Sequence, residues 1–189
     1  MENKDKIVEY LGYLIWIRLA AVALSLLCLI PVVETIAEGL DFLPNLAMVV
    51  VLWLLSNGQD RYRKASIYLA VSVCITFAAQ LFGSAAFVIV MLVSSVCSFI
   101  ALYQEYNAHA ELMEPVAPKV AGQWHSLFKW QVAYLLVTYV IAFVLVILLI
   151  EFPMINEIYA WAVQIVNLVY AWFYLRNLDA MRKELRNME

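Results

Sequence analysis

The chain has 189 residues, of which 66% are hydrophobic and 14% are charged, and its formal net charge at pH 7 is −3. Soluble domains are about half apolar and about a quarter charged, so this composition excludes an ordinary soluble globular domain. The apolar residues gather in long runs, which suit helices that cross a hydrocarbon layer about 30 Å thick. We therefore expect a single-domain, all-α protein: a polytopic transmembrane helical bundle with about six spans.

The first apolar run offers two positions for a span. A span at residues 7–30 would place Arg18 near the bilayer centre, at a cost of about 3 kcal/mol. A span at residues 19–37 leaves Arg18 at the membrane edge, behind a short amphipathic lead-in. We therefore expect the span at residues 19–37, with a kink at Pro31 and with Glu34 solvated in the last turn.

The remaining spans follow from apolar runs that charged or turn-forming residues separate. We expect them at residues 42–56, 65–82, 85–103, 127–150 and 158–175, with residues 104–126 as a cytoplasmic segment and residues 176–189 as a cytoplasmic tail. The helix of the fourth span is expected to continue through residues 104–112 until Pro115 and Pro118 stop it. Apart from Pro44 in the first turn of the second span, only Pro31 and no glycine lies inside a span, which argues against the broken helices of many carriers.

The distribution of positive charge predicts the topology. Lysine and arginine near spans mark the cytoplasmic side, and six spans with both termini in the cytoplasm place all 12 basic residues there. The outer regions instead carry Glu34, Glu38, Asp41, Glu151 and Glu157. We therefore expect a multi-pass protein of the cell membrane. The basic residues are Lys4, Lys6, Arg18, Arg61, Arg63, Lys64, Lys119, Lys129, Arg176, Arg182, Lys183 and Arg186.

The three cysteines carry no recognisable chemistry. Cys28, Cys74 and Cys97 lie on different spans without CxxC spacing, and free cysteines commonly serve as small core residues. The sequence also has no GxSxG, P-loop, HExxH or dinucleotide fingerprint. We expect no catalytic residue, no cofactor and no metal, and therefore no enzyme.

The only histidines lie in the cytoplasmic segment. Glu105 and His109 are four residues apart and share a helical face, and His125 approaches them if the segment forms a hairpin. The three side chains then offer a nitrogen and oxygen ligand set for a metal, or they are solvated residues at the level of the lipid headgroups. We favour the solvated interpretation because true metal motifs have short spacings.

Uncharged polar residues form stripes on four of the expected spans, at helical spacing. They either hydrogen-bond one another between helices or line a narrow, uncharged pocket for a neutral or amphipathic small molecule. The candidate pocket residues are Ser72, Thr76, Gln80, Gln131, Thr138, Gln164, Asn167 and Tyr174, and Ser94, Ser95, Ser98 and Tyr134 lie in the same stripes.

Two cytoplasmic segments carry apolar residues on one helical side. They pack on the membrane surface or dock another protein, and we favour surface packing. The nearly balanced charges of this side argue against nucleic acid as a partner. The apolar residues are Trp124, Leu127 and Phe128 in the segment and Leu178, Met181 and Leu185 in the tail.

These features favour a non-catalytic accessory or interaction subunit, whose partners are the lipid bilayer and another membrane protein or a second copy. The alternative is a substrate-capturing component of a vitamin-like uptake transporter. In size and helix number the chain is similar to the membrane-embedded binding components of energy-coupling-factor transporters. Arg18 before the alanine-rich residues 19–23 also resembles their helix-one interface.

Overall fold

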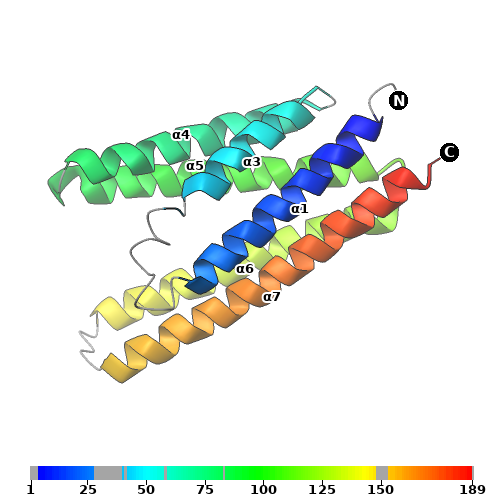
Figure 1. Ribbon diagram of the computed structural model, residues 1–189. Helices are drawn as coiled ribbons and strands as arrows, with labels where there is room; N and C mark the ends of the chain where they lie inside the picture. Colours follow the sequence, from blue (N-terminus) through cyan, green and yellow to red (C-terminus); the bar gives the residue numbers. More distant parts are fainter. Residues whose placement is uncertain are drawn as a thin grey trace.

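The computed structural model describes residues 4–27, 40, 42–57, 59–82, 84–147 and 153–188, and their regular structure consists of six helices without strands (Figure 1). The all-helical prediction is confirmed for these residues. Two helical stretches, Lys4–Leu27 and Ile89–Met113, are long and apolar enough to cross a membrane. The helices are α1 (Lys4–Leu27), α3 (Phe42–Leu55), α4 (Asp60–Phe82), α5 (Ser84–Met113), α6 (Pro118–Ile147) and α7 (Pro153–Arg186).

Local sequence explains several helix ends. Pro118 and Pro153 open α6 and α7, where the missing N–H of proline costs nothing. Helix α5 runs on to Met113, as expected, and the turn that follows is closed by a hydrogen bond of 2.7 Å from the Ala117 N–H to the Met113 carbonyl. Helix α7 joins the predicted sixth span to most of the predicted tail without a break.

Helix α1 differs from the expected first span. It is continuous from Lys4 to Leu27 and therefore includes both the expected lead-in and the first part of the expected span. Cys28, Pro31 and Glu34 lie outside the described residues, as does the expected outer loop around Glu151.

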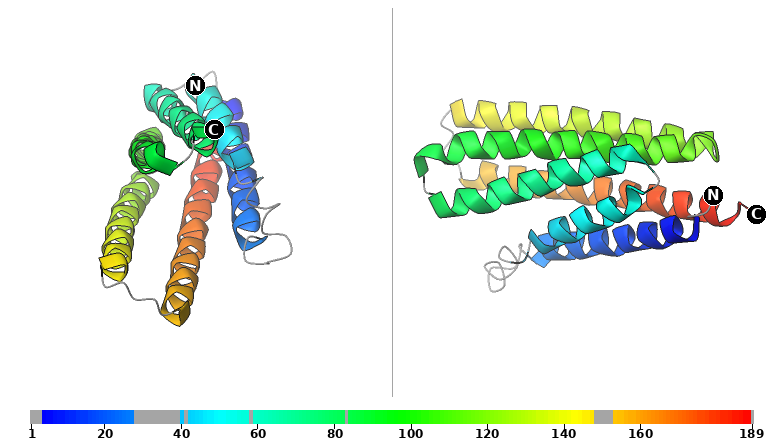
Figure 2. Two further views of the ribbon diagram at one scale, coloured as in Figure 1. Left: turned by 90° about the vertical axis from the view of Figure 1, so that its left-hand side faces the viewer. Right: turned by 90° about the horizontal axis from the view of Figure 1, so that it is seen from above.

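The six helices are arranged in a ring. The principal contacts join α1 to α3, α3 to α4, α4 to α5, α5 to α6, α6 to α7, and α7 back to α1 (Figure 2). Both chain ends and the turns before α4 and α6 lie at the same end of the ring (Figure 1). We call this the charged end, formed by residues 4–18, 56–64, 104–129 and 176–188, because it holds all 12 basic residues.

The buried core lies mainly at the charged end, and α4 and α5 separate from α6 and α7 toward the opposite end (Figure 1). The expectation that the apolar side chains of the cytoplasmic segments pack on the membrane surface is wrong, because these side chains pack against helices of the same chain. Phe128 is partly buried against this core. The fully buried core residues include Leu11, Leu14, Leu52, Leu55, Trp124, Leu178, Met181 and Leu185.

A ladder of hydroxyl groups joins α4 to α5 in the other half of the ring. The Oγ atom of Ser72 lies 2.8 Å from Ser94 Oγ and 2.6 Å from Ser98 Oγ, and Thr76 Oγ1 lies 2.7 Å from Ser94 Oγ. The hydroxyls of Ser72 and Ser94 also lie 3.1 and 3.2 Å from each other's backbone carbonyl, so each single O–H proton has more than one acceptor within reach. Small side chains that bond in this way let two helix backbones approach closely in a lipid environment.

We expect Ser94→Leu to lower the free energy of unfolding by about 1–3 kcal/mol, because a larger side chain overpacks the contact between α4 and α5. Ser95→Leu is the matched control, since Ser95 is exposed and bonds only the Met91 carbonyl of its own helix. The control should change the stability by less than about 0.5 kcal/mol. Denaturant unfolding in detergent micelles measures both, and equal losses would contradict the ladder's role.

Candidate functional site

An ion pair between a buried carboxylate and a partly exposed guanidinium crosses the interior of the ring at the charged end. The Nη2 atom of Arg18, on α1, lies 3.3 Å from Oε2 and 3.4 Å from Oε1 of Glu105, on α5. The Glu105 side chain is only 4% exposed. Because α1 and α5 are not principal neighbours in the ring, this pair connects opposite sides of the helix bundle.

Tyr174, on α7, holds the ion pair in place. Its hydroxyl donates to Oε1 of Glu105, and its ring lies 4.6 Å from the Arg18 guanidinium carbon. The carboxylate therefore has hydrogen-bond partners on two other helices, which a buried charge needs to offset its desolvation.

His109 lies one turn beyond Glu105 on α5 and continues the network to α4. The Tyr62 hydroxyl lies 2.7 Å from His109 Nδ1. Burial raises the pKa of Tyr62 well above its usual value, so the phenol stays protonated. The Nε2 atom of His109 lies 3.6 Å from Glu105 Oε1, which is longer than a hydrogen bond.

Aromatic rings surround these polar groups. The Trp124 ring, on α6, lies 4.4 Å from the His109 ring and 5.3 Å from the Tyr174 ring, and Tyr106 lies 5.4 Å from Trp124. The network thus draws side chains from α1, α4, α5, α6 and α7. We call it the inner plug, formed by Arg18, Tyr62, Glu105, Tyr106, His109, Trp124 and Tyr174.

The interpretation of Glu105 and His109 as solvated residues is wrong, because their exposed fractions are 3% and 0%. Their shared helical face was evident from the sequence, but their partners come from distant helices. One signal was available: Arg18 interrupts an apolar run, and an ionisable residue there calls for a counter-ion. His125 is exposed and takes no part in the inner plug. Within the described residues, no group of three or more histidine, cysteine or acidic residues is placed to hold a metal.

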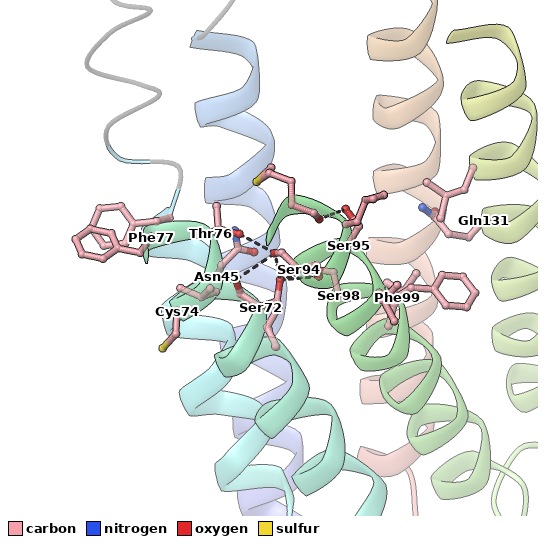
Figure 3. Close-up of a pocket in the computed structure, with 18 of the residues that line it drawn as sticks. Asn45, Ser72, Cys74, Thr76, Phe77, Ser94, Ser95, Ser98, Phe99 and Gln131 are labelled. Atoms are coloured by element: carbon pink, nitrogen blue, oxygen red, sulfur yellow. Dashed lines mark hydrogen bonds between the residues drawn. The ribbon is translucent and has the colours of Figure 1, made fainter. Parts of the chain in front are cut away.

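A cavity of about 1710 Å³ lies beyond the inner plug, between α3, α4, α5 and α6 (Figure 3). Its walls are mostly apolar, and the lining side chains that the structure describes include no charged residue. Polar side chains line it from α3, α4, α5 and α6: Asn45, Ser72, Thr76, Ser94, Ser95, Ser98 and Gln131.

The structure distributes the candidate pocket residues over several places. Ser72, Thr76 and Gln131 line the cavity, whereas Tyr174 belongs to the inner plug. The Gln164 amide donates to Ser25 on α1 at 2.7 Å, and the side chain of Gln80 lies outside the described ones.

The other two candidates lie at the contact between α6 and α7. Asn167 Oδ1 accepts a hydrogen bond of 3.0 Å from Tyr134, and the Thr138 carbonyl accepts one of 2.9 Å from Tyr159. Interhelical hydrogen bonds therefore account for much of the polar pattern, and the cavity accounts for another part of it.

Comparison of the chain with families of proteins, with characterised proteins and with solved structures finds no match. The functional argument therefore rests on the inner plug and the cavity.

We expect Glu105→Leu to lower the free energy of unfolding by about 1–3 kcal/mol, because it leaves the partly exposed Arg18 guanidinium without its carboxylate and the buried Tyr174 hydroxyl without its acceptor. Glu111→Leu is the matched control. It removes the partner of Arg61 in a half-exposed pair with a distance of 2.6 Å, and such pairs contribute about 0–1 kcal/mol. Denaturant unfolding in detergent micelles measures the difference.

The double variant Arg18→Leu/Glu105→Leu removes both charges, so its loss should be smaller than the sum of the two single losses. Additive losses, or a Glu105→Leu effect no larger than that of Glu111→Leu, would refute the structural role of the ion pair.

Proposed function

We propose that the chain is an integral membrane protein that crosses the bilayer six times, with the charged end and both termini in the cytoplasm. The separation of charge from exposed apolar surface supports this proposal most strongly. Residues 65–103, 130–150 and 158–175 contain no acidic or basic side chain. Large apolar side chains on these stretches face outward: Ile89 is 67% exposed and Leu136 is 62% exposed. Extended exposed apolar surface on a folded chain indicates contact with a membrane or a partner.

The arrangement of the helices agrees with this topology. An even number of crossings returns both termini to one side, and both lie at the charged end (Figure 1). Tryptophan is enriched at both membrane interfaces, and four exposed tryptophans lie where the apolar stretches meet the charged end: Trp16, Trp53, Trp130 and Trp172. Trp161, also exposed, lies toward the other end of α7.

An impermeant protease added to intact cells should leave a tag after Glu189 uncut, because the tail is in the cytoplasm. The same tag inserted between residues 152 and 153, in the expected outer loop, should be cleaved and serves as the control. Immunoblotting of the tag measures both. Cleavage of the C-terminal tag in unbroken cells would overturn the proposed orientation.

Within the membrane, we propose that the chain captures a neutral or amphipathic small molecule without catalysis. The cavity carries this proposal, because it combines apolar walls with a few polar groups, as ligand sites do. The buried position of Glu105 and His109 supports a non-catalytic role. Glu105 is bonded to Arg18 and Tyr174, so it is poorly placed to act as a base on a substrate.

The role of an accessory or interaction subunit has less support. The apolar side chains of the two cytoplasmic segments, which would dock a partner, are instead packed against other helices of the chain. Trp124 is buried at the inner plug, and Met181 and Leu185 pack in the core near the chain ends. A partner protein would therefore have to bind the lipid-facing helix surfaces instead.

Leu135→Trp should reduce the amount of bound small molecule at least fivefold, because Leu135 lines the cavity and the larger indole ring would project into it and clash with an occupant on that wall. Val140→Trp is the control, on the same helix but exposed and outside the cavity lining. Mass spectrometry of solvent extracts from protein purified in mild detergent measures the bound molecule. An empty wild-type protein that co-purifies with a second membrane protein would instead support the accessory role.

A further inference from the structure

The cavity is larger than most small-molecule sites. Its volume of about 1710 Å³ exceeds the roughly 300–1,000 Å³ that is usual for such sites. The space is therefore large enough for a molecule bigger than a typical soluble metabolite or vitamin, such as one with a long flexible chain.

The cavity opens through the apolar surface of the helices. Leu92 and Leu136 line it and are both 62% exposed, and Phe77 is 58% exposed. In the proposed topology these side chains face the lipid chains. A molecule can thus reach the cavity sideways from the bilayer without passing through water.

The polar lining restricts the chemistry of the occupant. The hydroxyl groups of Ser72, Ser94 and Thr76 already bond one another, and Ser95 donates to the Met91 carbonyl at 2.9 Å. These groups have therefore largely used their donors within the protein. An ionised headgroup would find no counter-charge among the lining residues that the structure describes.

Gln131 is different from the other polar lining residues. Its Oε1 atom is buried and has no hydrogen-bond partner among the described residues, and the side chain lies on the α6 wall of the cavity (Figure 3). A buried acceptor without a donor is costly. Rotation of the Gln131 side chain would turn Oε1 from its buried position toward the cavity, where a ligand hydroxyl or amide N–H would pair it and remove this cost.

We propose, on the basis of the capture function above, that the cavity binds one uncharged bilayer lipid whose hydroxyl or amide head donates a hydrogen bond to Gln131. The acyl or isoprenoid chain then lies along the apolar wall that Leu92, Leu135 and Leu136 form. The sideways opening, the uncharged lining and the unpartnered acceptor of Gln131, all taken from the described residues, fit this class of ligand.

Photoactivatable lipids in nanodiscs test the proposal. A diacylglycerol probe should label wild-type protein at least fivefold more than a phosphatidylglycerol probe with the same chains. Gln131→Met, which keeps the side-chain length and removes the acceptor, should weaken diacylglycerol labelling about fivefold, the value of one hydrogen bond. Gln123→Met is the matched control, because Gln123 lies outside the cavity lining and should leave labelling unchanged.

A second measurement uses only wild-type protein. A hydrocarbon-chain probe with a terminal hydroxyl should label the cavity about fivefold better than the same probe without it. Equal labelling by these two probes, stronger labelling by phosphatidylglycerol, or full labelling of Gln131→Met would overturn the proposal.

The outcomes also separate this inference from the capture function. If wild-type protein takes up no probe and carries no bound molecule, the capture function itself fails. If it carries a bound molecule that Leu135→Trp expels but that is charged or indifferent to Gln131, only the assignment of the ligand class fails.

Discussion

The ion pair between Arg18 and Glu105 is the interaction on which the arrangement of the helices depends. Helices that face lipid gain little from the hydrophobic effect when they associate, so packing and polar contacts must hold them together. This pair joins two helices that are not ring neighbours, and Tyr174 adds a third. A buried ion pair stabilises a fold only when further hydrogen bonds and close packing offset its desolvation. The aromatic rings around it supply that packing.

The inner plug and the hydroxyl ladder divide the ring into two functional parts. The plug closes the ring at the charged end, where most of the fully buried side chains lie. In the other half, the ladder holds α4 against α5 through hydrogen bonds between small side chains. The cavity is bounded by this rigid pair on one side and by α6 on the other. Its shape therefore depends on the position of α6. Trp124 in the inner plug and Phe128, which packs against Tyr106, hold α6 in that position.

The positions of most helices were predictable from the sequence, because apolar runs, prolines and charged residues determine where a helix begins and ends within a few residues. Proline at 118 and 153 places the starts of two helices, and the helical continuation to Met113 follows from its uninterrupted pattern. The inner plug was not predictable in the same way. Glu105 and Arg18 are 87 residues apart, and nothing local shows that they meet. The same limit applies to the cavity. The helical spacing of polar residues places Ser72 and Gln131 on the polar faces of their helices. Only the three-dimensional arrangement shows that both side chains line the same cavity.

A chain of aromatic contacts connects the cavity to the plug. Phe99 lines the cavity and lies 6.1 Å from Phe128, which in turn lies 5.8 Å from Tyr106. Tyr106 packs 5.8 Å from Tyr174, the residue that donates to Glu105. Protein interiors are close-packed, so such contacts transmit displacements rather than absorb them. The cavity floor and the ion pair are therefore parts of one packed unit. The ion pair at the charged end is thus joined to the cavity by continuous aromatic packing, although the described lining residues include no charged side chain.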